Sequence, residues 1–223
     1  MTPSRASKSL VPQQARSRES LRKLLKAAAE VLGQHGVEGA TIPRIAAHAG
    51  LTPGAIYRRF RDKDALLEAV VLGILERQDE RLRLGIAPAA AGQIPLPVFA
   101  EQFIGSMVVS QRANAPLLRA IRHFVHGKTH TPFARKAARY ETRALEWMVE
   151  LFLSHQPEMS HPEPRMAVSM GLLMVASTLI EMVVLPTDLG PIKAFMPKDD
   201  QGLKRELTRA FLSYVGCPRV SRP

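Results

Sequence analysis

The stretch TIPRIAAHAGLTPGAIYRRFRDKDALL, residues 41–67, decides the fold of this chain. It contains two short segments with apolar residues at helical spacing, and each segment is opened by a threonine and an early proline. Thr41 and Thr52 are expected to act as N-caps, because a threonine hydroxyl accepts a hydrogen bond from the free amides of a first helical turn. Gly50 is expected to end the earlier helix in the left-handed conformation that glycine favours. Two short helices joined by a tight turn are typical of a helix-turn-helix unit.

Apolar residues on either side predict how these helices pack. A longer helix before them, ending at GQHGVEG (residues 33–39), is predicted from leucines and alanines on one face, and Asp62 is expected to cap a fourth helix. The residues expected to face the core are Leu21, Leu24, Leu25, Ala28 and Leu32 of the first helix, Ile42, Ile45, Ala46 and Ala49 of the second, Ile56 and Phe60 of the third, and Leu66, Leu67, Val70, Val71, Ile74 and Leu75 of the fourth.

With Ile56 and Phe60 turned inward, the third helix exposes a basic face and a start made of small residues. In a helix-turn-helix unit the second of the two short helices enters the DNA major groove. Arg58 or Arg59 could contact guanine, whereas Tyr57 and Lys63 suit the phosphate backbone. The residues expected to contact DNA are Thr41, Arg44, Thr52, Pro53, Gly54, Ala55, Tyr57, Arg58, Arg59 and Lys63. The alternative is that YRRFRDK (residues 57–63) is a solvated basic surface.

The distribution of charge favours the DNA interpretation. The 223 residues carry a formal net charge of +11, which indicates a polyanionic partner. Residues 1–63 hold 12 Lys and Arg against 4 Asp and Glu, a net of +8, whereas the other 160 residues hold 19 and 16, a net of +3. The N-terminal third is therefore the part expected to face the polyanion.

Residues 41–67 also resemble the DNA-binding signature of TetR-type transcriptional regulators. The resemblance rests on Thr41, Ile45-Ala46 with Ala49-Gly50, the small residue at 54, the aromatic residues at 57 and 60, Lys63, and Ala65-Leu66-Leu67; it extends over about residues 17–75. It implies a homodimeric repressor, less often an activator, whose C-terminal domain binds a small ligand and then moves the DNA-reading heads. The basic pair Arg58-Arg59 and the early Pro43 depart from many relatives, so the operator sequence does not carry over.

The remaining sequence predicts a second, larger helical domain, and we expect an all-α fold without strands. The expected organisation is a flexible basic arm over residues 1–16, a helix-turn-helix domain over 17–63, a connecting helix over 64–84, a Pro/Gly/Ala linker over 85–97, and a helical ligand-binding and dimerisation domain over 98–223. Its helices are predicted at about 98–112, 115–126, 132–155, 164–185 and 199–215.

Residues 166–185, MAVSMGLLMVASTLIEMVVL, are nearly long and apolar enough to span a membrane. Glu181, the serines and threonines, and the prolines on either side argue for a soluble helix instead. A helix that is apolar all round is buried on all sides. We therefore predict that this helix and the one at 199–215 place one face on their own core and the other on a second copy of the chain.

Methionine and aromatic side chains of the second domain could line a pocket for a largely apolar small-molecule effector. Plain core packing is the competing explanation for each. The candidates are Phe103, Met107, Phe124, Trp147, Met148, Met170 and Met174, the last two in a stripe with Met166. His123, His126 and His130 could share a helical face as metal ligands, but Gly127 is expected to end the helix first, and no metal or cofactor is predicted.

The remaining function classes find less support in the sequence. An enzyme would need a nucleophile elbow, a phosphate loop, an HExxH motif or a thiolate cluster, and we find none. The single cysteine, Cys217, fits a reducing compartment, and no signal peptide is recognisable, so a cytoplasmic location is expected. A basic protein of the membrane surface is the other alternative, supported by the net charge and residues 166–185. A regulator that binds an operator in double-stranded DNA is the prediction that uses the most observations.

Overall fold

The structure is a computed structural model that describes residues 10–85, 87–185 and 190–217. Over these ranges the chain is helical and contains no strand, which confirms the predicted all-α class. The chain divides into two compact units, residues 1–73 and residues 74–223, and each is described on its own.

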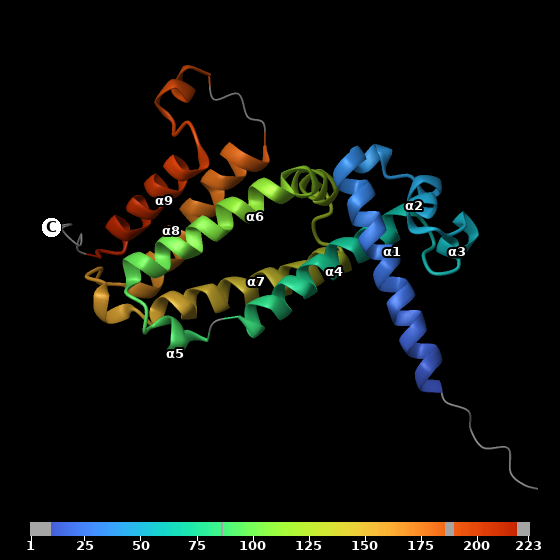
Figure 1. Ribbon diagram of the computed structural model, residues 1–223, viewed down its shortest axis with the longest axis horizontal. Coiled ribbons are helices and arrows are strands. Elements are labelled where there is room, and N and C mark those ends of the chain that lie inside the picture. Colours follow the sequence, from blue (N-terminus) through green and yellow to red (C-terminus); the bar gives the residue numbers. More distant parts are fainter. Residues whose placement is uncertain (1–9, 86, 186–189, 218–223) are drawn as a thin grey trace, which may run out of the picture. The chain divides into compact units, whose positions relative to one another are not determined.

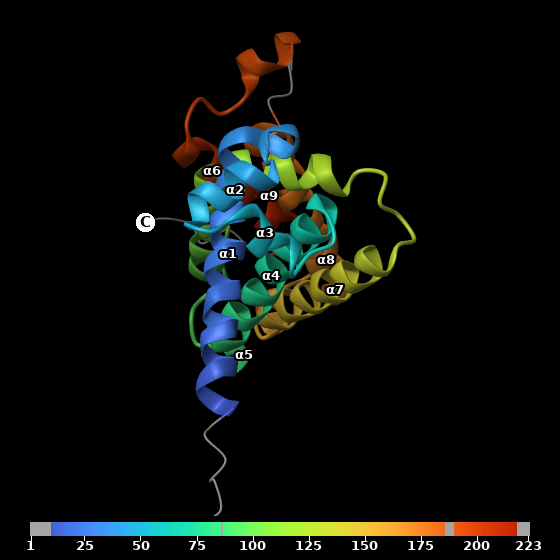
Figure 2. The ribbon, with the colours of Figure 1, turned by 90° about the vertical axis from the view of Figure 1, so that its right-hand side faces the viewer.

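The N-terminal unit contains α1 (Leu10–Gly39), α2 (Ile42–Ala49), α3 (Pro53–Tyr57) and the first part of α4 (Lys63–Leu84). Figures 1 and 2 show α2 beside α1, and α3 packs against α2. Their apolar faces meet in a core from which water is almost wholly excluded. The side chains that are 0–1% exposed are those of Leu24, Ala28, Val31, Leu32, Ala40, Ile45, Ala46, Ile56, Leu66, Leu67 and Val70.

The predicted N-caps of α2, α3 and α4 are confirmed. The Thr41 hydroxyl accepts a hydrogen bond from the Arg44 amide at 3.4 Å, and the Thr52 hydroxyl accepts one from the Ala55 amide at 3.3 Å. Asp62 Oδ1 accepts one from the amide of residue 65 at 2.7 Å. Gly50 ends α2 at φ 65°, ψ 34°, a left-handed conformation that is unfavourable for a residue that has a Cβ. The turn between α2 and α3 is therefore fixed by its own chemistry.

The structure corrects two expectations for the N-terminal unit and confirms the break expected at residues 33–39. Residues 10–16, which we expected within a flexible arm, belong to α1; residues 1–9 of that arm lie outside the described residues. The break expected at residues 33–39 is present as Gly36, whose φ of 67° interrupts α1. Because α3 ends at Tyr57, Arg58, Arg59 and Phe60 follow the helix instead of lying on it, and Phe60 is only half-buried.

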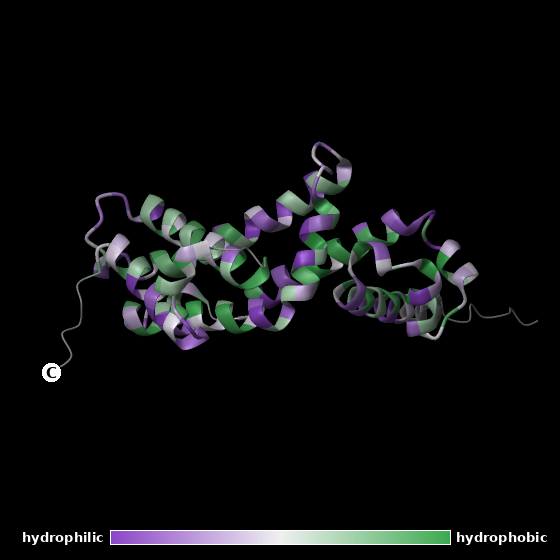
Figure 3. Cartoon of the chain, turned by 90° about the horizontal axis from the view of Figure 1, so that it is seen from above, coloured by the Kyte–Doolittle hydropathy of each residue, from purple (hydrophilic) through white to green (hydrophobic). Residues whose placement is uncertain are grey.

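The C-terminal unit begins within α4, and its described residues form four longer helices and several short ones. They are α5 (Pro88–Ala91), α6 (Leu96–Val125), α7 (Pro132–Leu153), η1 (Gln156–Glu158), α8 (Pro164–Leu179), the π-helical turn η2 (Ile180–Val184), η3 (Gly190–Phe195) and α9 (Asp200–Tyr214). Figure 1 shows α6 alongside α8 and α9, and these three helices pack against one another. Seen from above, the helices carry both hydrophobic and hydrophilic residues (Figure 3).

The sequence misplaced two boundaries in this unit. The expected linker 85–97 contains α5 and the start of α6. The two helices expected at 98–112 and 115–126 are one helix, because α6 continues through Pro116. A proline inside a helix removes one hydrogen bond and costs about 3 kcal/mol. Here the apolar face of α6 continues on both sides of Pro116, with Val108, Ala115 and Phe124 all buried, and this packing holds the helix together.

Aromatic rings fill the core of the C-terminal unit. Phe152 of α7 contacts Phe99 and Phe103 of α6, with centroids 5.1 Å away in both cases, and Phe211 of α9, 4.8 Å away. The Phe211 ring of α9 packs against α8 at Gly171. A Cβ at that position would stand 2.7 Å from the ring, so the contact requires glycine. Gly171 therefore sets how closely α8 and α9 approach.

One polar cluster lies beside this core at the start of α6. Both carboxylate oxygens of Glu158 accept the Leu96 amide, at 3.1 and 2.9 Å, and Oε1 lies 3.2 Å from Nδ1 of His155. His155 is buried, and its Nε2 has no hydrogen-bond partner among the described residues. Glu158 thus ties η1 to the first turn of α6.

Burial, helped by the Glu158 carboxylate, raises the pKa of the Cys217 thiol.

Candidate DNA-binding site

The residues at the start of α3 are exposed, as the sequence predicts. Thr52, Pro53 and Gly54 lie on the surface, whereas Ala55 is half-buried. Apart from Gly54, its two neighbours and the backbone of its own helix, no atom of the described residues lies within 4 Å of the point where a Gly54 Cβ would stand, so this end of the helix is open to a close approach. The narrow end of α3 therefore has the shape that contact with base edges requires.

The three large residues that follow are also exposed, and they differ in what holds them. Tyr57 is 55% exposed, and the Arg58 side chain forms no hydrogen bond or ion pair with any described residue. Arg59 reaches back to α1, where its Nη2 lies 3.5 Å from the Ser20 hydroxyl. Because Arg58 is unrestrained, it is the arginine most available for a bidentate contact to a base.

Two predicted contact residues are tied into the N-terminal unit by hydrogen bonds. Arg44 donates through Nη1 to the Gly39 carbonyl at 2.6 Å, and Lys63 donates through Nζ to the Val37 carbonyl at 3.1 Å. Both bonds fasten the end of α1 to the helices after it. Lys63 is half-buried, so it has a structural contact in addition to any that it makes with phosphate.

Acidic residues near this surface are paired. Asp62 lies 2.9 Å from Nε of Arg61, and Oε2 of Glu30 lies 2.8 Å from Nε2 of His48. The hydrogen bond from His48, with a smaller effect of Lys26, holds the pKa of the Glu30 carboxyl below its ordinary value. The same contact joins α1 to α2, so it stabilises the frame on which α3 is mounted.

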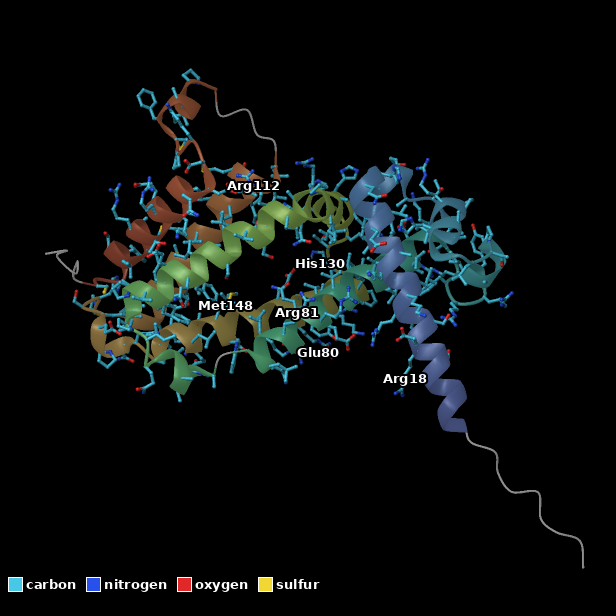
Figure 4. The ribbon with its side chains drawn as sticks, viewed as in Figure 1. Arg18, Glu80, Arg81, Arg112, His130 and Met148 are labelled. Carbon is cyan, nitrogen blue, oxygen red and sulfur yellow. The ribbon has the colours of Figure 1, made fainter. Side chains whose placement is uncertain are left out.

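The structure does not bring the seven candidate ligand-binding residues together at one site. Phe103, Met107, Trp147 and Met148 pack against the core of the C-terminal unit; Met148 is labelled in Figure 4. Phe124 is buried at the far end of α6, where its ring meets that of Phe133. Met170 and Met174 are 39% and 41% exposed on α8, on the same side as Met166. Core packing therefore explains Phe103, Met107, Trp147 and Met148, whereas Met170 and Met174 lie on an exposed apolar face.

That exposed face runs along α8 and α9. Met166, Met170, Leu173, Met174 and Tyr214 are 38–56% exposed. A groove of about 520 Å³ lies between the two helices, lined by Leu173, Met174 and residues of α9 that include Ala210. Large apolar side chains gathered on a surface in this way mark a place where another molecule binds.

The three candidate metal ligands are separated. His123 and His126 lie near the end of α6, whereas His130 stands in the connection to α7, at φ 64° (Figure 4). Among the described residues, no group of three or more His, Cys, Asp or Glu could hold a metal ion. Two arginines that the sequence did not single out, Arg119 and Arg122, lie on one face of α6 with His123 and His126, because these four residues are spaced by three, four and seven positions from Arg119.

Comparison with known proteins agrees with this geometry. Residues 24–70, which run from α1 into α4, match the family model described as bacterial regulatory proteins, TetR family. The HTH-type transcriptional regulator BetI of Escherichia coli, for example strain K12 / DH10B, is 27% identical over 126 residues, or 56% of this chain. The matched segment spans 63% of that relative's length.

Two solved structures show the same fold along nearly the whole chain. A TetR-family regulatory protein from Rhodococcus RHA1 superposes with a TM-score of 0.63 at 18% identity, covering 90% of this chain and 98% of that one. The regulator FadR from Bacillus subtilis, solved with stearoyl-CoA, gives 0.55 at 16% identity, covering 89% and 99%. The signature in residues 41–67, the family model matched over residues 24–70 and the two-part helical fold agree: the N-terminal unit carries a DNA-binding domain similar to that of TetR-family regulators, and the chain shares their fold.

Proposed function

We propose that this chain is a transcriptional regulator that binds an operator in double-stranded DNA through α3. The observation that carries the proposal is the open start of α3 together with the unpaired Arg58 side chain at the end of that helix, on the part of the chain with a net charge of +8. Base contacts would come from Arg58 and the start of α3, and phosphate contacts from Tyr57, Thr41 and the helix N-termini. A cytoplasmic location goes with this function.

The regulator acts as a homodimer in this proposal, with α8 and α9 forming the interface. One described helix, Pro164–Val184, is long and apolar enough to cross a membrane by length and composition. Its inward face is, however, occupied by core residues, among them Val168, Leu172 and Leu179, packed against other helices of the unit. The outward face needs a single apolar partner, and a second copy of α8 and α9 supplies one of matching chemistry.

Release from DNA by a small molecule completes the proposal, and repression is the mode that the family resemblance favours. A ligand lowers DNA affinity only by its difference in affinity between the DNA-binding and non-binding conformations. α4 runs without interruption from one unit into the next, since the division after Gly73 falls inside it. We propose that this helix carries the change.

The test is selection of duplexes from a random pool by the full-length chain, followed by gel-shift measurement on the selected duplex. We expect a two-fold-related sequence to be enriched, because a symmetric dimer reads two half-sites. A pool that stays random after several rounds, with equally weak binding to every duplex, would refute the proposal.

A further inference from the structure

A second groove lies at the end of α6, inside the C-terminal unit. It has a volume of about 460 Å³, which lies within the range of small-molecule sites. The last two turns of α6 form one wall, and Leu185, which follows η2, belongs to the other. The lining residues are Arg119, Arg122, His123, Val125, His126 and Leu185.

The charged side chains that line this groove are basic. Two of the six lining side chains are arginines and two are histidines, and none of the six is acidic. Basic residues in a last helical turn are favoured by the helix dipole, which accounts for Arg122 and His123 without any ligand. It does not account for Arg119, which lies one turn earlier.

The two arginines are arranged for binding. Arg119 donates through Nε to the Val184 carbonyl at 3.0 Å, so its guanidinium is held in place while its terminal nitrogens make no hydrogen bond to the described residues. Arg122 is exposed, and its side chain forms no hydrogen bond or ion pair with the described part of the chain. A fixed guanidinium beside a free one can hold the two oxygens of a carboxylate, since arginine donates in a planar fork.

The remaining walls are apolar, because Val125 and Leu185 complete the groove. We propose that this groove binds an organic carboxylate with a short apolar tail, its carboxylate on Arg119 and Arg122 and its tail along Val125 and Leu185. The chemistry differs from that of the largely apolar effector expected from the methionines and aromatic residues. A regulatory effect of this ligand rests on the proposed function, whereas its binding does not.

The test uses octanoate as the probe and full-length protein, with affinity measured by isothermal titration calorimetry. 1-Octanol has a matching tail without the charge, and inorganic phosphate has charge without a tail. We expect octanoate to bind and to bind at least tenfold more tightly than either of the others. Equal binding of octanol, or equal binding of phosphate, would overturn the proposed ligand class.

Matched variants locate the site. Arg122→Gln removes a groove charge that has no structural partner, and Arg139→Gln removes another exposed arginine, on α7 and outside the groove. We expect octanoate affinity to fall about tenfold in Arg122→Gln and to stay within twofold in Arg139→Gln, with both variants unfolding at the wild-type temperature. Equal losses in the two variants would mean general charge attraction and would overturn the site.

DNA binding by the same samples is measured separately, without octanoate. If the wild-type chain binds octanoate through Arg122 but shows no sequence preference for DNA, the proposed function fails and this site stands. If DNA binding is specific and octanoate does not bind, the reverse holds.

Discussion

Glu158 shows what a single residue does in this fold, because it serves a helix start and a buried histidine together. Glu158→Ala leaves the Leu96 amide without its carboxylate and removes the partner of His155 Nδ1. Losing a cap costs about 0.5–2 kcal/mol, and an unpaired buried polar group about 1–3. We expect the free energy of unfolding to fall by about 1–3 kcal/mol in urea denaturation.

The control for this prediction is Glu146→Ala, which removes an exposed carboxylate of α7. It should change the free energy of unfolding by less than about 0.5 kcal/mol. Equal effects of the two substitutions would show that Glu158 is not the cap of α6.

Glu30 gives the N-terminal unit a defined pH dependence. Its carboxyl has a lowered pKa when folded, chiefly through the hydrogen bond from His48, so it stabilises the folded state above its ordinary pKa. That contribution is lost as the pH falls through the lowered value. We expect Glu30→Gln to be less stable than wild type near pH 6, and the difference to vanish toward pH 3.

NMR titration of the Glu30 carboxyl carbon checks the cause. In His48→Ala its pKa should return toward the ordinary value. An unchanged titration curve in that variant would exclude His48 as the partner that lowers the pKa of Glu30.

At the scale of the helices, close packing decides which glycines can be replaced. Gly171→Ala would place a Cβ 2.7 Å from the Phe211 ring, in the core. Gly105→Ala would meet the Cδ atom of Lys204 at 2.9 Å, in the middle of an unbranched side chain that can adopt another rotamer. We expect Gly171→Ala to lower the free energy of unfolding by about 1–3 kcal/mol, and Gly105→Ala to leave it unchanged or raise it by up to about 1 kcal/mol.

Thermal unfolding of the two variants tests this comparison. A loss in Gly105→Ala as large as that in Gly171→Ala would mean that glycine flexibility, and not the contact between α8 and α9, governs stability here.

The helices themselves were predictable to different degrees for physical reasons. The caps Thr41, Thr52 and Asp62 are local signals, and the structure has each of them in its predicted place. Pro116 misled the prediction because a proline ends a helix only where packing on both sides of it is weak. Phe60 was misplaced since nothing in the local sequence indicates that α3 ends at Tyr57.

In the candidate sites, too, local features were predictable and those that depend on the tertiary structure were not. Exposure of Tyr57 follows from the helical period once Ile56 is buried, whereas Arg58 and Arg59 are exposed in the turn that follows α3. The internal bonds of Arg44 and Lys63 do not, because they depend on where the end of α1 lies in space. The methionines of α8 were assigned to a pocket because an apolar stripe has the same pattern whether it faces a ligand, the core or another chain.

At the scale of the whole molecule, the exposed face of α8 predicts the oligomeric state. We expect the wild-type chain to sediment as a dimer at micromolar concentration. Leu173→Glu places a charge on the 56% exposed apolar face of α8 and should yield a monomer, because a buried unpaired charge is costly in an interface. Val109→Glu alters a 68% exposed residue of α6 and should remain a dimer.

Sedimentation equilibrium over a concentration series distinguishes these outcomes. A monomeric wild-type chain at micromolar concentration would contradict the interface, and so would a dimer in which Leu173→Glu changes nothing.

The central claim is that α3 reads DNA sequence, and one measurement addresses it most directly. This is the ratio of affinities for the selected duplex and a scrambled duplex, measured by gel shift for wild type, Arg58→Ala and Arg61→Ala, where Arg61 is an exposed arginine paired with Asp62. We predict that Arg58→Ala loses about 1–3 kcal/mol of discrimination while Arg61→Ala keeps the wild-type ratio. A ratio near one for wild type, or equal losses in the two variants, would contradict the account.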